Sequence, residues 1–232
     1  MKKFGGPTGM AGLLSFNGGF VDTAGFLGLQ GLFVAHVTGN FVTLGAALVH
    51  GSQGIIGKVL ALPEFVIVIA LARLAGIALR ARQWPAARSL LCAKVSFLTC
   101  FFALAVIFGP FPDPNTPAAL LTGFAGIAAM AIQNAVQRVH LSALPPTTLM
   151  TGSTTQATID AVDLIAGVAP ALRPAILARF ARLSLTLLYF AAGCAAAAIL
   201  YALIGFWCLA LSVVVGALAA AMHIEEPAAA TA

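Results

Sequence analysis

Two small polar triplets hold similar places in the two halves of a very apolar chain, Thr38-Gly39-Asn40 and Thr151-Gly152-Ser153. Glycine permits a sharp turn and a close backbone approach, and the hydroxyl and amide groups beside it can cap a helix that starts there. The free N–H groups of a helix N-terminus attract anions. Two such ends that met inside a membrane would bind a small polar or anionic solute. The alternative is that each triplet only caps a short, packed helix.

One carboxyl group stands in the middle of the first apolar segment, at Asp22. A charge at that depth costs several kcal/mol unless it is paired or takes up a proton. Its counterpart in the second half is Asn134, which has nearly the same shape without the charge. This asymmetry is expected of a proton- or cation-coupled site, and the Asp22→Asn variant should then lose proton-linked uptake but stay folded. Alternatively, the carboxyl group is only bonded to helix backbone or to a hydroxyl such as that of Thr38.

Three basic side chains could act with Asp22. Arg73 and Arg182 each follow, by ten and eight residues, a proline that opens an apolar segment, which places them roughly 12–15 Å into a core about 30 Å thick. Arginine keeps its charge, so each must pair, for instance with Asp22, bind an anionic solute, or extend to the membrane surface. His36 titrates near neutral pH and could relay protons; the alternative is a histidine hydrogen-bonded where the chain breaks.

Four further polar residues follow in the second half. Gln133 could line a cavity beside Asn134, whereas Arg138 is interpreted as a marker of the cytoplasmic boundary. Asp160 and Asp163 are three residues apart and therefore share a helix face. That face either contacts cytoplasmic water or takes part in cation coupling.

Composition sets the class of protein in which these residues act. The 232 residues are 61% hydrophobic and 8% charged, whereas a soluble domain has about 25% charged residues, and the mean hydropathy is +1.02. These values predict an all-α integral membrane protein, with the lipid bilayer rather than nucleic acid as its partner. The four cysteines lie in apolar stretches without a C-x-x-C pair, so we expect neither a disulfide nor a metal site, and no cofactor is indicated.

Six segments are long and apolar enough to span a bilayer. They cover about 8–30, 62–82, 90–110, 117–137, 174–200 and 203–223. Two pieces, 38–50 and 151–167, are shorter and polar at their starts, which predicts re-entrant or half helices. Lysine and arginine favour cytoplasmic loops. If the short pieces do not cross, nine of the twelve basic residues fall inside, including Lys2, Lys3 and the cluster from Arg80 to Lys94. Both termini are then cytoplasmic.

The two halves, 1–112 and 113–232, present their features in the same order. Corresponding positions are Asp22 and Asn134, Pro63 and Pro174, Arg73 and Arg182, and the two triplets. We interpret the halves as an internal repeat within one membrane domain. Each copy holds three spans, and an odd number turns the second copy upside down relative to the first. Such inverted repeats are common in secondary transporters. Abundant small residues allow close helix packing, and a homodimer is expected to bury polar surface.

Two longer stretches carry a family resemblance, GGFVDTAGFLGLQGLFVAHVTGN in the first half and AIQNAVQRVHLSALPPTTLMTGSTTQ in the second. They resemble the YoaK-like family of bacterial inner-membrane proteins, which is grouped as a domain of unknown function. The resemblance implies a membrane protein of this size and location but no settled activity. The pattern matches at Asp22, Phe33, His36, Thr38, Gly39 and Asn40, and at Gln133, Asn134, Arg138, Thr151 and Gly152. It departs at Ala131, where glycine is expected, which concerns packing more than chemistry.

The sequence favours a small secondary transporter. It would bind a small polar solute, with an anion favoured, at the midplane between the starts of the two short helices, and Asp22 would supply proton coupling. The expected substrate contacts are Asp22, His36, Thr38, Gly39, Asn40, Arg73, Gln133, Asn134, Thr151, Gly152, Ser153 and Arg182. The alternative is a channel for a small ion on the same scaffold. An enzyme is not expected, because no H-E-x-x-H, G-x-S-x-G or Gly-rich nucleotide loop occurs.

Overall fold

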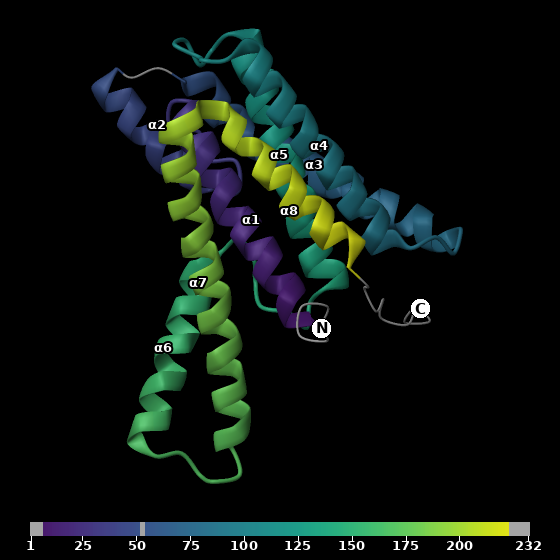
Figure 1. Ribbon diagram of the computed structural model, residues 1–232, viewed down its shortest axis with the longest axis vertical. Helices are drawn as coiled ribbons and strands as arrows, with labels where there is room; N and C mark the ends of the chain where they lie inside the picture. The colour runs from purple at the N-terminus through teal and green to yellow at the C-terminus, as the bar shows by residue number, and fades with distance from the viewer. Residues whose placement is uncertain (1–6, 52–53, 223–232) are drawn as a thin grey trace.

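A computed structural model of the chain describes residues 7–51 and 54–222, which are mainly helical (Figure 1). The helices are α1 (Pro7–Gly28), α2 (Gly39–His50), α3 (Ile55–Ala81), α4 (Ala86–Phe108), α5 (Pro117–His140), α6 (Met150–Ala166), α7 (Arg173–Ile204) and α8 (Leu209–Ala221), with a 3₁₀ turn, η1 (Gly205–Cys208), between the last two. The predicted all-α class is confirmed. Lys2 and Lys3, used above to orient the chain, lie outside the described residues.

Four helical runs in the described part of the chain are long and apolar enough to cross a membrane, judged by length and composition. They are α3, α4, α5 and the continuous run from α7 to α8. Helix α1, predicted as the first span, is not among them, since Asn17 and Asp22 lower its hydropathy. Helix α2, with 12 residues, is roughly 18 Å long and α6, with 17, roughly 26 Å. Both fall short of a core about 30 Å thick.

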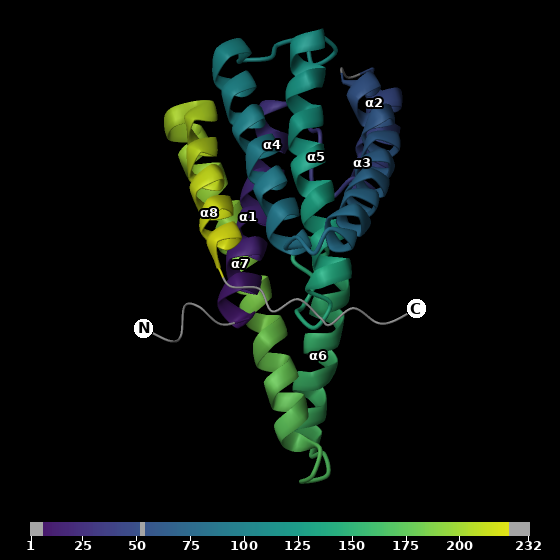
Figure 2. The same cartoon turned by 90° about the vertical axis from the view of Figure 1, so that its right-hand side faces the viewer.

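The two halves of the chain are interleaved rather than packed as separate bodies. Helix α1 packs along α7, and α5 packs against both α3 and α4. Helix α8 lies against α1 and α4, while the short helices α2 and α6 pack on α3 and α7 respectively. Figure 2 shows α6 and the adjoining half of α7 extending beyond the other helices as a hairpin. The core is therefore built mainly around α1, α4 and α5.

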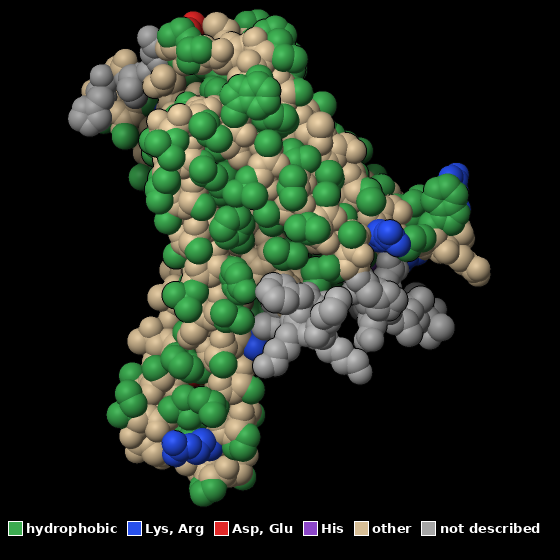
Figure 3. Space-filling model, in the orientation of Figure 1, with side chains coloured by type: hydrophobic (Ala, Val, Ile, Leu, Met, Phe, Trp, Pro, Cys, Tyr) green, Lys and Arg blue, Asp and Glu red, His purple; other side chains and the backbone are tan. Residues whose placement is uncertain are grey.

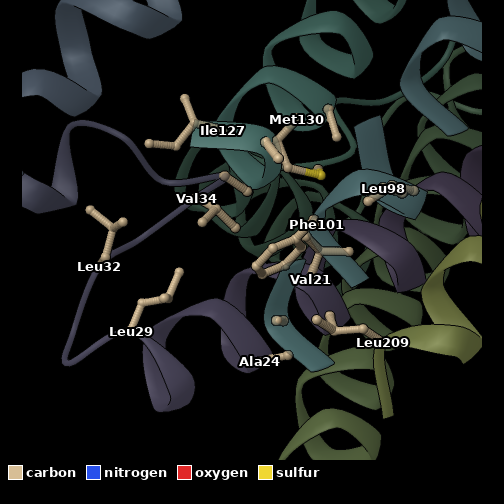
Figure 4. Packing of buried hydrophobic residues seen from close by; sticks show 14 of the residues in the cluster. Val21, Ala24, Leu29, Leu32, Val34, Leu98, Phe101, Ile127, Met130 and Leu209 are labelled. Carbon is tan, nitrogen blue, oxygen red and sulfur yellow. The ribbon is translucent and has the colours of Figure 1, made fainter. Parts of the chain in front are cut away.

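An irregular segment, 29–38, enters this core between α1 and α2. Its side chains Leu29, Leu32 and Val34 are buried in one cluster with residues of α1 and α5, and Val34 lies beside Ile127 and Met130 (Figure 4). Helix α5 meets the segment closely: a Cβ on its Gly123 would stand 2.6 Å from a methyl carbon of Leu32. Non-helical backbone at membrane depth persists only where protein or a wet cavity covers it, so this segment is a candidate for a functional site.

The surface fits a membrane environment. Large apolar side chains on α2, α3 and α7 are exposed, for example Val42, Val66 and Leu188. Figure 3 shows hydrophobic side chains over most of one face, with lysine and arginine gathered over the lower end of the α6–α7 hairpin and over the turn between α3 and α4. We conclude that the chain is a membrane-embedded helical protein.

Two sequence interpretations of individual residues are wrong. Pro63 does not open a span, because α3 begins eight residues earlier at Ile55, whereas Pro174 does lie in the first turn of α7. Lys94 is not in a cytoplasmic loop. It lies on α4 with no exposed surface, because the helix begins at Ala86 and Lys94 falls on its packed face.

Candidate functional site

Asp22 on α1 holds the irregular segment 29–38 in place. Its Oδ1 atom accepts hydrogen bonds from the backbone N–H groups of Val34 (2.9 Å), Ala35 (2.7 Å) and His36 (3.3 Å). Its Oδ2 atom lies 2.7 Å from Nδ1 of the His36 ring. The carboxylate is only 6% exposed, and three backbone donors plus an imidazole satisfy it. Asp22 is thus an anchor for the segment as well as the partner of His36.

His36 is the member of this pair that meets solvent. Its side chain is 31% exposed, and its ring stands edge-on to Phe33 and Phe190, with centroids 6.2 and 5.7 Å away. Since Nδ1 faces Asp22, Nε2 is the nitrogen left for a ligand or a proton.

The pair lies in a pocket of about 380 Å³, called the histidine pocket below. Its walls are Asp22, Thr23, Phe26, Leu27, Phe33, His36, Gly39, Phe190 and Cys194. They come from α1, the irregular segment, the first residue of α2, and α7. Most of this lining is aromatic or aliphatic, so the polar chemistry of the pocket is concentrated at the Asp22–His36 pair.

The first triplet, Thr38-Gly39-Asn40, ends the irregular segment, but it does not form the predicted side-chain cap of α2. Thr38 precedes α2 but makes no side-chain capping bond and is exposed. Asn40 instead folds back on Phe33: its Oδ1 accepts the Phe33 N–H at 2.9 Å and its Nδ2 donates to the Phe33 carbonyl at 2.8 Å. An amide side chain can satisfy both backbone groups at once. Asn40, 1% exposed, therefore fixes the bend that presents His36.

The second half repeats the anchoring position with neutral groups. Oδ1 of Asn134 on α5 accepts a 2.7 Å bond from the hydroxyl of Thr148, 14 residues along the chain, the same separation as between Asp22 and His36. Beside it, the Nε2 group of Gln133 donates to the Leu14 carbonyl and to the Thr147 hydroxyl. Gln133 is fully buried, so it connects α1 with the 141–149 segment rather than lining a cavity.

A second pocket, of about 540 Å³, lies at the start of α6 and is called the arginine pocket below. Its walls include Arg138, Leu149, Gly152, Ser153, Gln156, Arg179 and Arg182. The predicted caps Thr151 and Ser153 lie inside α6, which begins at Met150, and no side chain caps it. Ser153 is 4% exposed, and its hydroxyl has no hydrogen-bond partner among the described residues.

The structure does not bring the two triplets together. Gly39 lines the histidine pocket, Gly152 and Ser153 line the arginine pocket, and Thr151 lies at a third surface hollow on α6. Within the described residues α2 and α6 do not pack against each other, and Figure 1 shows them at opposite ends of the molecule. The expected chamber shared by two helix ends is therefore absent from the described structure, because α2 packs on α3 whereas α6 packs on α7.

A model of one protein family matches residues 10–222 and is described as "Protein of unknown function (DUF1275)". The match covers both halves of the chain and both pockets. The chain belongs to the DUF1275 family. The YoaK-like family is a DUF1275 family, so the resemblance noted from the two motif stretches is confirmed. Comparisons with curated proteins and with solved structures give no significant match.

The two arginines that the sequence places inside the membrane differ in their surroundings in this DUF1275 chain. Arg73 on α3 is exposed and borders a recess of only about 10 Å³. It does not pair with Asp22, whose bonds go to the 34–36 backbone and His36. Arg182 on α7 is also exposed but stands in the wall of the arginine pocket. Of the two predicted arginine contacts, only Arg182 is placed at a pocket of useful size.

Two polar features of this DUF1275 protein were missed or misread in the sequence. Asp160 does not face water: it is fully buried and bonded to Arg179 through both carboxylate oxygens, at 2.9 and 2.6 Å. The Lys94 ammonium is buried with no hydrogen-bond partner among the described residues. Asp160 and Arg179 are 19 residues apart, so no short sequence motif indicates that they pair. Lys94 follows a cluster of arginines, which favours a position in a loop.

Proposed function

We propose that this DUF1275 protein is a small secondary transporter built on an inverted repeat. It carries a small polar solute, with an anion favoured, and couples its movement to a proton held by the Asp22–His36 pair. The histidine and arginine pockets open toward opposite sides of the membrane. The observation that carries the proposal is the irregular segment 29–38, which is buried among helices, anchored on a carboxylate and turned so that a titratable ring enters a pocket.

The pattern of helix packing supports the inverted repeat. If α1 to α4 correspond to α5 to α8, each contact should have a counterpart with the halves exchanged. The pairs α1–α7 and α5–α3 are counterparts, as are α4–α5 and α8–α1, and α2–α3 and α6–α7. The α3–α4 contact is an exception, because α7 meets the 3₁₀ turn η1 rather than α8. The contact between α4 and α8 is its own counterpart and lies where a two-fold axis would run. An axis of this kind in the membrane plane is the usual arrangement for inverted repeats.

The equivalent anchoring bonds, Asp22 with His36 and Asn134 with Thr148, support a division of labour between the halves. In the first half the bond joins two titratable groups, whereas in the second it joins two neutral ones. A proton-coupled transporter needs a titratable pair in only one of its two halves. The arginines lie in the second pocket, the arginine pocket. The proton would be carried by the His36 ring, whose Nε2 atom is turned away from Asp22, while the Asp22 carboxylate accepts three backbone N–H bonds.

A transport cycle follows from this geometry. Solute and proton enter the histidine pocket, where protonated His36 is a positive donor toward an anion. Movement of α1 against α7 then closes that pocket and opens the arginine pocket. We place the protein in the bacterial inner membrane with both termini in the cytoplasm, which puts the arginine pocket on the cytoplasmic side in accordance with the positive-inside rule. A homodimer remains a prediction, as does the absence of enzymatic activity.

The second candidate function is an ion channel. The arginine pocket and the exposed ring of His36 would suit a path for small anions. A carrier must change conformation once per cycle, on a microsecond-to-second scale. Its flux saturates with solute concentration, whereas the flux through a channel continues to rise.

The proposal predicts anion-dependent proton entry into liposomes that contain the purified protein and a trapped pH dye. Chloride, sulfate, inorganic phosphate and succinate are each added outside at pH 6, with the interior at pH 7.5. We expect at least one anion to acidify the interior with saturation. The His36→Gln variant should lose most of that proton entry, because glutamine cannot carry the proton, while Arg73→Gln should retain it. No acidification with any of the four, or equal acidification in the His36→Gln variant, would contradict the proposal.

A further inference from the structure

The arginine pocket gathers an excess of positive charge around a helix start. Arg138 comes from the last turn of α5, and Arg179 and Arg182 come from α7. The first turns of α6 and the 143–149 segment before it form the remaining wall. Arg179 is held by Asp160 in a two-oxygen ion pair. The guanidinium groups of Arg138 and Arg182 form no hydrogen bond or ion pair with another described residue; the bond at Arg182 is made by its backbone carbonyl, which accepts from the Thr186 hydroxyl. Two guanidinium groups thus border the pocket without a counter-charge.

The start of α6 adds neutral donors to the same space. Its first N–H groups have no helical acceptor, and they carry the positive end of a 17-residue helix dipole. Ser153 belongs to this turn, and its hydroxyl is buried in the pocket wall without a partner. Gly152 beside it leaves the approach to the helix end open, since a Cβ there would meet nothing within 4 Å. An unpartnered buried hydroxyl is costly unless a ligand or water satisfies it.

We propose that the arginine pocket is a binding site for a phosphate group. Arg138 and Arg182 supply two planar forks of donors, the geometry that matches phosphate oxygens. The Ser153 hydroxyl and the α6 N-terminus supply further donors, and the Arg179–Asp160 pair holds α6 and α7 at the spacing that forms the pocket. A pocket of about 540 Å³ has room for more than the phosphate itself, so the group belongs to a free solute or to a lipid headgroup. The binding site depends only on this geometry, whereas its role as the cytoplasmic end of a solute path depends on the proposed function.

Binding is tested on the full chain purified in a sugar-based detergent, without any transport step. Inorganic phosphate is titrated calorimetrically, and phospholipid that remains bound is measured by native mass spectrometry. We expect Arg182→Gln and Arg138→Gln each to weaken the affinity at least about tenfold, since each removes a charge-assisted contact. Ser153→Ala should weaken it about three- to tenfold. The matched control is Arg173→Gln, which removes an exposed arginine of α7 outside the pocket and should leave the affinity unchanged.

The two sources of phosphate give different results. If inorganic phosphate binds to the wild type and to Arg173→Gln in the calorimeter but not to Arg182→Gln, the site exists and its ligand is a free phosphate-bearing solute. Retention of an anionic phospholipid by the wild type and Arg173→Gln, but not by Arg182→Gln, supports it with a lipid headgroup. Neither form of binding, or equal binding in both variants at unchanged melting temperature, overturns the inference. Phosphate binding without proton-linked uptake would reject the proposed transporter but support the phosphate site. Proton-linked uptake without phosphate binding would support the transporter but reject the phosphate site.

Discussion

The Asp22→Ala variant is expected to lose about 3–6 kcal/mol of stability, the largest effect of any single polar substitution in the described chain. The change leaves the backbone N–H groups of Val34, Ala35 and His36 without an acceptor. Val34 and Ala35 are almost fully buried, so water does not readily replace the carboxylate. Each buried donor left unsatisfied costs about 1–3 kcal/mol. Unfolding in detergent, followed by circular dichroism against denaturant concentration, measures the loss.

Asp22→Asn separates the anchoring role from the charge. The asparagine Oδ1 can still accept the three backbone bonds, so we expect a loss of only about 1–2 kcal/mol together with the loss of proton coupling. Asp163→Ala on α6 is the matched control, because the Asp163 carboxylate forms no hydrogen bond with another described residue, and the effect should stay within about 0.5 kcal/mol. Equal stabilities for the alanine and asparagine variants of Asp22 would show that the backbone bonds do not hold the segment.

The second large effect is expected at Gly193, where α7 crosses α1. A Cβ at Gly193 would collide with the carbonyl oxygen of Phe16, and one at Gly19 on α1 would collide with the carbonyl oxygen of Phe190. Each helix therefore meets the other backbone to backbone, which is typical of small-residue contacts between membrane helices. Because backbone atoms cannot rotate away as a side chain does, Gly193→Ala should force the helices apart and cost more than about 2 kcal/mol.

Gly45→Ala on α2 is the control for Gly193→Ala: the chemical change is the same, but no loss of stability is expected. A Cβ at Gly45 meets nothing within 4 Å, and alanine is a better helix former than glycine by up to about 1 kcal/mol. We therefore expect Gly45→Ala to be neutral or mildly stabilising. Thermal unfolding followed by size-exclusion chromatography in detergent compares the two variants. A Gly193→Ala protein as stable as the Gly45→Ala protein would mean that the α1–α7 crossing is looser than described.

The sequence predicts the helices well because their signals are local. The short helices expected at 38–50 and 151–167 occur as Gly39–His50 and Met150–Ala166, since the polar triplets interrupt the apolar runs on either side. The pairing of Asp22 with a polar neighbour could also be anticipated, because a carboxyl inside an apolar segment requires partners. The partners proposed from the sequence, Thr38 and Arg73, are not those that the fold supplies.

Contacts between distant segments could not be predicted in this way. A helix that is apolar on every side does not indicate which face is buried, so Lys94 could not be assigned to the packed face of α4. The Asp160–Arg179 pair likewise depends on how α6 folds back along α7. The separation of the two triplets into different pockets has the same origin: their positions along the chain are equivalent, but α2 packs on α3 and α6 packs on α7.

The central claim is that the two pockets open toward opposite sides of the membrane, and labelling of introduced cysteines tests it most directly. The background protein has its native cysteines replaced by alanine: Cys92, Cys100, Cys194 and Cys208. One cysteine is then placed at Thr38, which is exposed beside the histidine pocket, or at Gly152, where the arginine pocket has room for a side chain. A membrane-impermeant maleimide is applied to right-side-out and to inverted membrane vesicles.

The account predicts that Thr38→Cys reacts in right-side-out vesicles and Gly152→Cys reacts in inverted ones. Saturating amounts of an anion that supports proton entry should slow both reactions, because the solute occupies the pockets. Labelling of both positions from the same side would contradict the inverted repeat and, with it, the proposed transport cycle.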